Sequence, residues 1–159
     1  MADTMDLARA QKVYETLCAA LDHDDWHYKK DEEALTIECG ARGEDLPMEL
    51  LVKVDVDRML VMLLSKIPFQ IAEDKRLDVA VAVSVINNML VDGSFDYDVA
   101  SGRIFFRMTN SYIESNLGEE MFRYLVYCSC KTIDSFNDKL LMLSKGVLSL
   151  EQFIQSVKN

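Results

Sequence analysis

The chain has 159 residues, half of them apolar, and its 17 Lys and Arg against 27 Asp and Glu give a formal net charge of −10. This length suits one domain with a real hydrophobic core, and the composition excludes a disordered or collagen-like chain. The acidic balance argues against nucleic-acid binding, which depends on a basic surface. We therefore treat residues 1–159 as a single domain and expect no nucleic acid among its partners.

The acidic residues are concentrated in the first part of the chain. Residues 1–60 hold 15 acidic and 7 basic residues, whereas residues 61–159 hold 12 and 10. Such a surface attracts basic partners and repels anionic lipid, or it simply keeps the protein in solution. No segment approaches the ~18 apolar residues of a membrane span, and the acidic N-terminus is unlike a signal peptide. We expect a cytoplasmic protein that binds no membrane.

The first half of the chain predicts a helix followed by a hairpin. Apolar residues at intervals of three and four indicate a helix over residues 6–21. Alternation of apolar and polar residues then predicts strands at 26–30 and 35–39, joined by a short polar turn. We expect a loop at residues 40–48.

Two further strands and a helix are expected next. Residues 50–56 alternate, whereas residues 59–64 form an unbroken apolar run, which indicates a strand covered on both faces or one deep in the sheet. Residues 77–91 also alternate like a strand, but about fifteen residues is long for a strand. Because Asp92-Gly93 is a typical helix stop, we predict a buried helix at 77–91.

The clearest hairpin lies at residues 95–108, where Ala100-Ser101-Gly102 provides the turn. On its second strand, Arg103 and Arg107 share a face with Phe105. These arginines could hold an acidic or aromatic ligand, or they could pair with the acid-rich N-terminal half of the chain.

The last third is predicted to be helical. Asn116 and Glu119 have the spacing of a capping box, and the helix that follows should end at Gly146. Ser149 and Gln152 form a second capping box before a short helix at about 150–157.

Chemistry-bearing motifs are few. The turn at residues 22–27 gathers three Asp and two His, but their spacing favours a solvated turn over a metal site. The four Cys form no CxxC motif and are best explained as reduced structural thiols. Asn87 and Asn88 could bind a ligand, but we favour a structural role in which they satisfy nearby backbone groups. Without a nucleophile or phosphate-binding motif, we predict no enzyme, no cofactor and no metal.

A resemblance is carried by residues 83–107, VSVINNMLVDGSFDYDVASGRIFFR. An Asn in the middle helix is followed by a Gly, an aromatic residue, an acidic hairpin loop and a Gly-Arg pair before the last strand. In this order the chain resembles the YbjN-like family of bacterial sensory transduction regulators, whose fold is similar to that of type III secretion chaperones. The resemblance covers about residues 10–145. It implies an α+β fold in which a twisted antiparallel sheet of five or six strands carries N-terminal, middle and C-terminal helices.

The resemblance also implies a way of working. Secretion chaperones of this fold are small and acidic, are commonly dimeric, and bind extended segments of client proteins, so it implies a protein or peptide partner and allows a homodimer. We predict a non-enzymatic protein-binding or regulatory module that binds a partner segment across its sheet or along a sheet edge. The predicted partner-binding residues are Trp26, Tyr28, Phe105 and Arg107. The alternative is a small-molecule sensor with its ligand held between the sheet and a helix.

Overall fold

The computed structural model describes residues 4–158, and its centre is a six-stranded sheet. All the strand pairings are antiparallel, and the strand order is β1-β2-β3-β4-β6-β5. The strands are β1 (Tyr28–Asp31), β2 (Thr36–Arg42), β3 (Pro47–Asp55), β4 (Leu60–Gln70), β5 (Ser94–Asp98) and β6 (Arg103–Ser111). The α+β prediction, with six strands, is confirmed.

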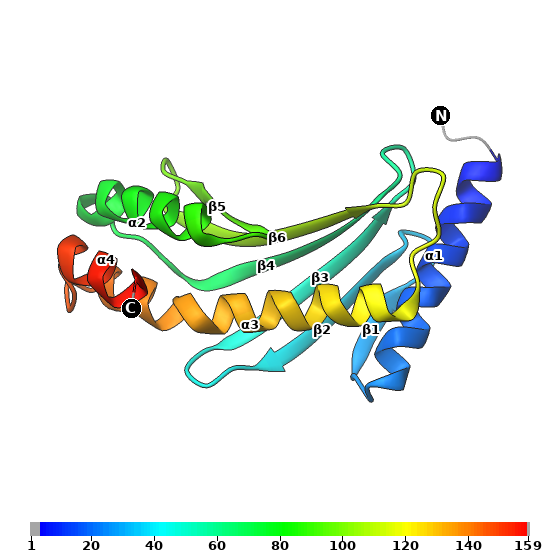
Figure 1. Ribbon diagram of the computed structural model, residues 1–159, viewed down its shortest axis with the longest axis horizontal. Coiled ribbons are helices and arrows are strands. Elements are labelled where there is room, and N and C mark those ends of the chain that lie inside the picture. Colours follow the sequence, from blue (N-terminus) through cyan, green and yellow to red (C-terminus); the bar gives the residue numbers. More distant parts are fainter. Residues whose placement is uncertain (1–3, 159) are drawn as a thin grey trace.

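Four α-helices accompany the sheet, and Figure 1 shows them on one side of it. The long helix α3 runs along this side and crosses α1 near one end, while α2 and α4 lie together at the opposite end. Within residues 4–158, no helix combines the length and the hydrophobicity that a bilayer crossing needs. The helices are α1 (Thr4–His23), α2 (Arg76–Met89), α3 (Glu119–Ser144) and α4 (Leu150–Lys158), with a short 3₁₀ turn, η1 (Glu73–Lys75), before α2.

The alternation in the sequence decides which side of the sheet the helices cover. In β3, Leu50, Val52 and Val54 are buried, whereas Leu51 and Lys53 between them are exposed. Because successive side chains of a strand point to opposite faces, this pattern gives the sheet one covered and one uncovered face. The core lies between the covered face and the helices.

The apolar run at residues 59–64 belongs to β4, which continues to Gln70. This strand lies between β3 and β6, so the expectation of a strand deep in the sheet holds, while coverage of both faces is wrong. Leu63 is fully buried, and its neighbour Leu64 on the other face is only half-buried. Position within the sheet, rather than double coverage, accounts for the unbroken run.

The ambiguous segment at residues 77–91 is helical, as predicted, although the helix spans Arg76–Met89 and so ends two residues before the predicted end. The buried side chains of α2 are Val79, Ala82, Val83 and Ile86, which have the spacing of one helix face. The hairpin that follows turns at Gly102, whose φ of +73° lies in the left-handed region that glycine favours. The strands and turn of this hairpin lie where the sequence placed them.

The two predicted capping boxes have different outcomes. Before α4, the Ser149 Oγ accepts the Gln152 N–H at 3.2 Å and the Gln152 Oε1 accepts the Ser149 N–H at 2.9 Å, so this box is confirmed. The box at Asn116 is wrong, because α3 begins at Glu119 after Gly118, and no side chain bonds at that cap.

Candidate functional site

The uncovered side of the sheet, which we call the open face, is the candidate functional site. The strand registers align the side chains of this face in two neighbouring rows. One row crosses five strands, and the other contains the register pairs Gly40–Glu49 and Lys66–Phe105. Both rows mix apolar and charged residues. The first row consists of Lys29, Glu38, Leu51, Leu64 and Arg107.

A hollow of about 700 Å³ lies on the open face between these rows. Leu51, Leu64 and Phe105 give it an apolar wall, and the Leu51 side chain is 37% exposed. Gly40 also lines the hollow, where a side chain would fit, because a Cβ built there meets only the Met48 carbonyl oxygen, at 3.6 Å. A glycine inside a strand often marks a place where another molecule can approach the backbone.

Charged side chains of both signs surround the apolar wall. They are Lys29 on β1, Glu38 on β2, Glu49 on β3 and Lys66 on β4. Among the residues that the structure describes, none of these four takes part in an ion pair. The hollow therefore offers apolar contact together with positive and negative groups that remain available to a ligand.

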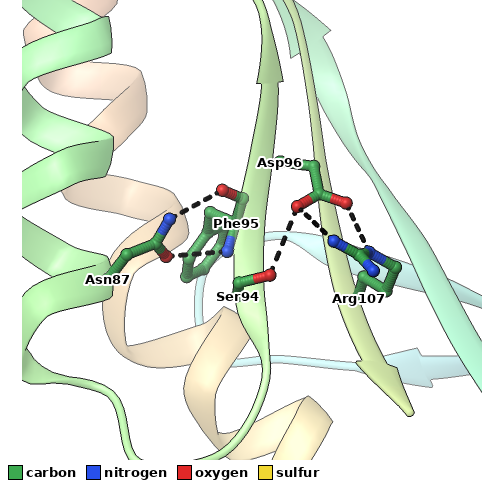
Figure 2. Close-up of polar contacts among 5 residues, drawn as sticks. All are labelled: Asn87, Ser94, Phe95, Asp96 and Arg107. Atoms are coloured by element: carbon green, nitrogen blue, oxygen red, sulfur yellow. Dashed lines mark hydrogen bonds and ion pairs between the residues drawn. The ribbon is translucent and has the colours of Figure 1, made fainter.

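Two predicted contact residues, Phe105 and Arg107, lie on the open face. Arg107 is already engaged, since its guanidinium donates two hydrogen bonds to Asp96, at 2.6 Å and 3.1 Å (Figure 2). This partnership raises the pKa of Arg107 above its usual value. The Arg103 Nε bonds to the Ser101 Oγ at 3.1 Å. The alternative in which these arginines pair with the N-terminal half is wrong, because their partners lie within the 94–111 hairpin.

The other two predicted contact residues lie in different places. Tyr28 lies beside the hollow on β1, but it pairs in register with the buried Cys39, so its side chain lies on the covered face and packs against the core. Its hydroxyl donates to the Asp22 carboxylate at 2.9 Å. Trp26 precedes β1 and lines a separate cavity on the helix side of the sheet. The structure thus brings Phe105 and Arg107 to the open face and places the side chains of Tyr28 and Trp26 on the helix side of the sheet.

The two edges of the sheet differ from its open face, because both are protected. At β5, the Asn87 side chain accepts the Phe95 N–H at 2.8 Å and donates to the Phe95 carbonyl at 2.9 Å (Figure 2). This confirms the structural role expected of Asn87. At the other edge, β1 has only four residues and carries Lys29 and Lys30, which disfavour the addition of another strand.

The acidic turn before β1 makes polar contacts with α3. Asp24 accepts a hydrogen bond from the Arg123 Nε at 2.8 Å, which holds the pKa of this carboxyl below its usual value. His23 Nδ1 lies 3.8 Å from the Glu119 carboxylate. Within residues 4–158, no three His, Cys, Asp or Glu side chains are gathered as metal ligands would be.

The four cysteines are free thiols. Burial raises the pKa of Cys39 to about 11, and burial, helped by the nearby Cys39 and Asp134, raises that of Cys130 to about 11. Both thiols therefore stay protonated at neutral pH, and a protonated thiol is a poor nucleophile.

The sequence reasoning missed Gly40, Leu51 and Leu64. Gly40 was assigned to a loop at residues 40–48, but β2 continues to Arg42 and β3 begins at Pro47. A signal was present, since Leu51 and Leu64 occupy positions where an exposed strand face usually carries polar residues.

Comparison with known proteins is informative at the level of structure and not of sequence. No family model matches the chain, and no curated protein matches it by sequence. Among solved structures, the chain is similar to YbjN from E. coli, described as a candidate transcription regulator, with a TM-score of 0.56 and 13% identity over 76% of this chain and 85% of that one. At this level of identity the similarity establishes the architecture. The chain has a YbjN-like fold, as the resemblance in residues 83–107 implied.

Proposed function

We propose that this protein is a non-enzymatic binding module that holds a segment of a partner protein on the open face of its sheet. The observation that supports this most directly is the hollow beside Gly40, which is walled by Leu51, Leu64 and Phe105. A sheet face exposed to water is usually polar, so a recessed apolar wall on such a face is typical of an interaction site.

The segment lies across the strands rather than along an edge. Addition of a strand needs free backbone groups, and the Asn87 side chain already bonds the outward N–H and carbonyl of Phe95 on β5. The opposite edge, β1, is short and charged. The open face therefore remains as the accessible part of the sheet.

The surroundings of the hollow specify the chemistry of the partner segment. It carries a large apolar side chain that fills the space beside Gly40, flanked by residues that pair with the unpaired charges of the rim. Because the whole protein has a formal charge of −10, a segment with a net positive charge is favoured during approach. Whether binding is regulatory would depend on the protein that carries the segment. A regulatory role agrees with the description of YbjN as a candidate transcription regulator.

The experiment fills the hollow without touching the core. Peptides are selected on the wild-type protein from a phage-displayed library of random twelve-residue sequences, and their affinities are measured by calorimetry. The variant Gly40→Phe places a ring in the hollow, where a Cβ is accommodated. We expect the selected peptides to share an apolar anchor and to lose at least about tenfold in affinity for this variant, because the anchor site is occupied.

The matched control is Gly118→Phe. Gly118 precedes α3, and a Cβ at this position meets no atom within 4 Å, so both positions can accommodate the same added side chain. Peptide affinity should be unchanged in the control. Failure to select peptides, or equal binding by the two variants, would contradict the proposal.

A further inference from the structure

A second cavity, of about 380 Å³, lies on the helix side of the sheet. It is bounded by the end of α1, by α3 and by the loop between β2 and β3. The sheet itself lies between this cavity and the hollow on the open face. Its floor is apolar. The floor residues are Ala20, Leu21, Met48, Phe122 and Val126.

The loop between β2 and β3, which forms one side of this cavity, is hydrogen-bonded to α3. The Glu44 N–H donates to the Asp134 carboxylate at 2.9 Å. Gly43 approaches Asp134 so closely that a Cβ at Gly43 would overlap its carboxylate, and the same Cβ would lie 2.9 Å from the Leu46 carbonyl oxygen. Glycine at this position allows the loop to approach the helix closely enough for this hydrogen bond to form.

Six charged residues line the cavity, and some of them already have an ion-pair or hydrogen-bond partner. Arg123 pairs with Asp24 at 2.8 Å, and Asp134 accepts the hydrogen bond from the loop. Arg42 and Lys131 belong to no ion pair within residues 4–158. The remaining acid, Glu44, is exposed on the loop. Two cations are therefore available to a ligand.

Two aromatic side chains complete the lining. Trp26 is half-buried, and Tyr127 on α3 is 67% exposed. Arg123, Tyr127 and Lys131 are spaced four residues apart, so they form one line along α3 beside the cavity. An aromatic ring can contact the apolar floor and these aromatic side chains while an attached anion meets Arg42 and Lys131.

We propose that this cavity binds a small organic anion with an aromatic body. The volume is within the range of small-molecule sites. The rest of the acidic surface repels anions, so selectivity for an anion depends on the two unpaired cations. This site is independent of the open face and of the partner segment proposed for it.

Trp26, the only tryptophan of the chain, makes the proposal directly measurable. The probes are 8-anilinonaphthalene-1-sulfonate and N-phenyl-1-naphthylamine, which share one aromatic body and differ in the sulfonate. We expect saturable quenching of Trp26 fluorescence by both, with the anionic probe binding at least about tenfold more tightly because charge-assisted hydrogen bonds are strong. In the double variant Arg42→Gln/Lys131→Gln this preference should disappear.

The control double variant Lys29→Gln/Lys66→Gln removes the same charge from the hollow on the open face. It should keep the preference for the anionic probe, as should Gly40→Phe. The single variant Lys131→Gln, on an exposed side chain, is expected to show an intermediate preference and serves if the double variant folds poorly. Absence of saturable quenching, equal affinity for the two probes, or an undiminished preference in the cavity variants would overturn the proposal. None of these results depends on whether the open face binds a peptide.

Discussion

The two faces of the sheet are built from the same strands, yet they differ in how far their apolar side chains are covered. On the covered face, Val52, Leu63 and Phe106 are completely buried beneath the helices. On the open face, Leu51 and Leu64 are in part exposed beside unpaired charges. Adjacent residues of one strand can therefore serve stability on one side and recognition on the other, because successive side chains point in opposite directions.

Because of this contrast, the binding site that we propose can occupy an apolar part of the sheet without weakening the fold. Substitutions on the open face remove little buried surface, whereas those on the covered face leave cavities in a close-packed core. The separation makes the site open to experiment, since binding and stability can be changed independently.

The strongest test of the contrast compares two leucines that are adjacent on β4. Leu63→Ala, on the covered face, should lower the free energy of unfolding by about 2–5 kcal/mol, because it leaves a cavity. Leu64→Ala, on the open face, should cost less than about 1 kcal/mol. Urea denaturation followed by circular dichroism measures both. Equal losses would show that the open face is as tightly packed as the core.

A smaller effect is expected at the edge that Asn87 protects. Asn87→Ala leaves the N–H and carbonyl of Phe95 without their partner and should cost about 1–3 kcal/mol. It also uncovers a strand edge, so the variant should self-associate in analytical ultracentrifugation. The neighbouring Asn88→Ala, at an exposed position, is the control and should change neither property. An Asn87 variant that stays as stable and as monodisperse as this control would show that the amide does not guard the edge.

The covered face is also held by Tyr14 of α1, whose hydroxyl donates to the Thr36 carbonyl at 3.0 Å. Tyr14→Phe should cost about 1 kcal/mol at neutral pH. Burial raises the pKa of Tyr14 from 10.0 to about 12, so the folded state holds this proton to higher pH than the unfolded state does. Its contribution to stability is complete below pH 10 and is lost as pH rises towards 12. Thermal melts at pH 8 to 12 should show a steeper decline in the wild type than in Tyr14→Phe, and parallel declines would rule out this linkage.

The smallest effect is expected for the ion pair on the open face. The side chains of Arg107 and Asp96 are 44% and 42% exposed, so solvent screens their attraction. Arg107→Gln should cost no more than about 1 kcal/mol, and the loss should shrink in 1 M salt. Chemical denaturation at low and high salt checks this. A loss of several kcal/mol would mean that the pair holds the hairpin in place.

The fold was predictable because its periodic patterns are strong. Alternation fixed the hairpin at residues 95–108, and length together with the Asp92-Gly93 stop decided for the helix at 77–91. The start of α3 was not predictable from Asn116, since a capping pattern in the sequence does not show which residue becomes the N-cap of the helix. The site was harder, because sequence periodicity cannot show which strands are neighbours. Lys29 and Phe105 share a hollow only because β1, β2, β3, β4 and β6 follow one another in the sheet.

The order of the strands has a consequence for how fast the chain can fold. Four of the five strand pairings join strands that are consecutive in the sequence, and the pairing of β4 with β6 is the exception. To form it, the chain must close a loop that contains η1, α2 and β5. Pairings between distant segments form slowly because the entropy of loop closure is lost before their contacts form. The meander β1–β4 and the hairpin β5–β6 can each assemble early, and the rate-limiting barrier then lies where β4 and β6 meet.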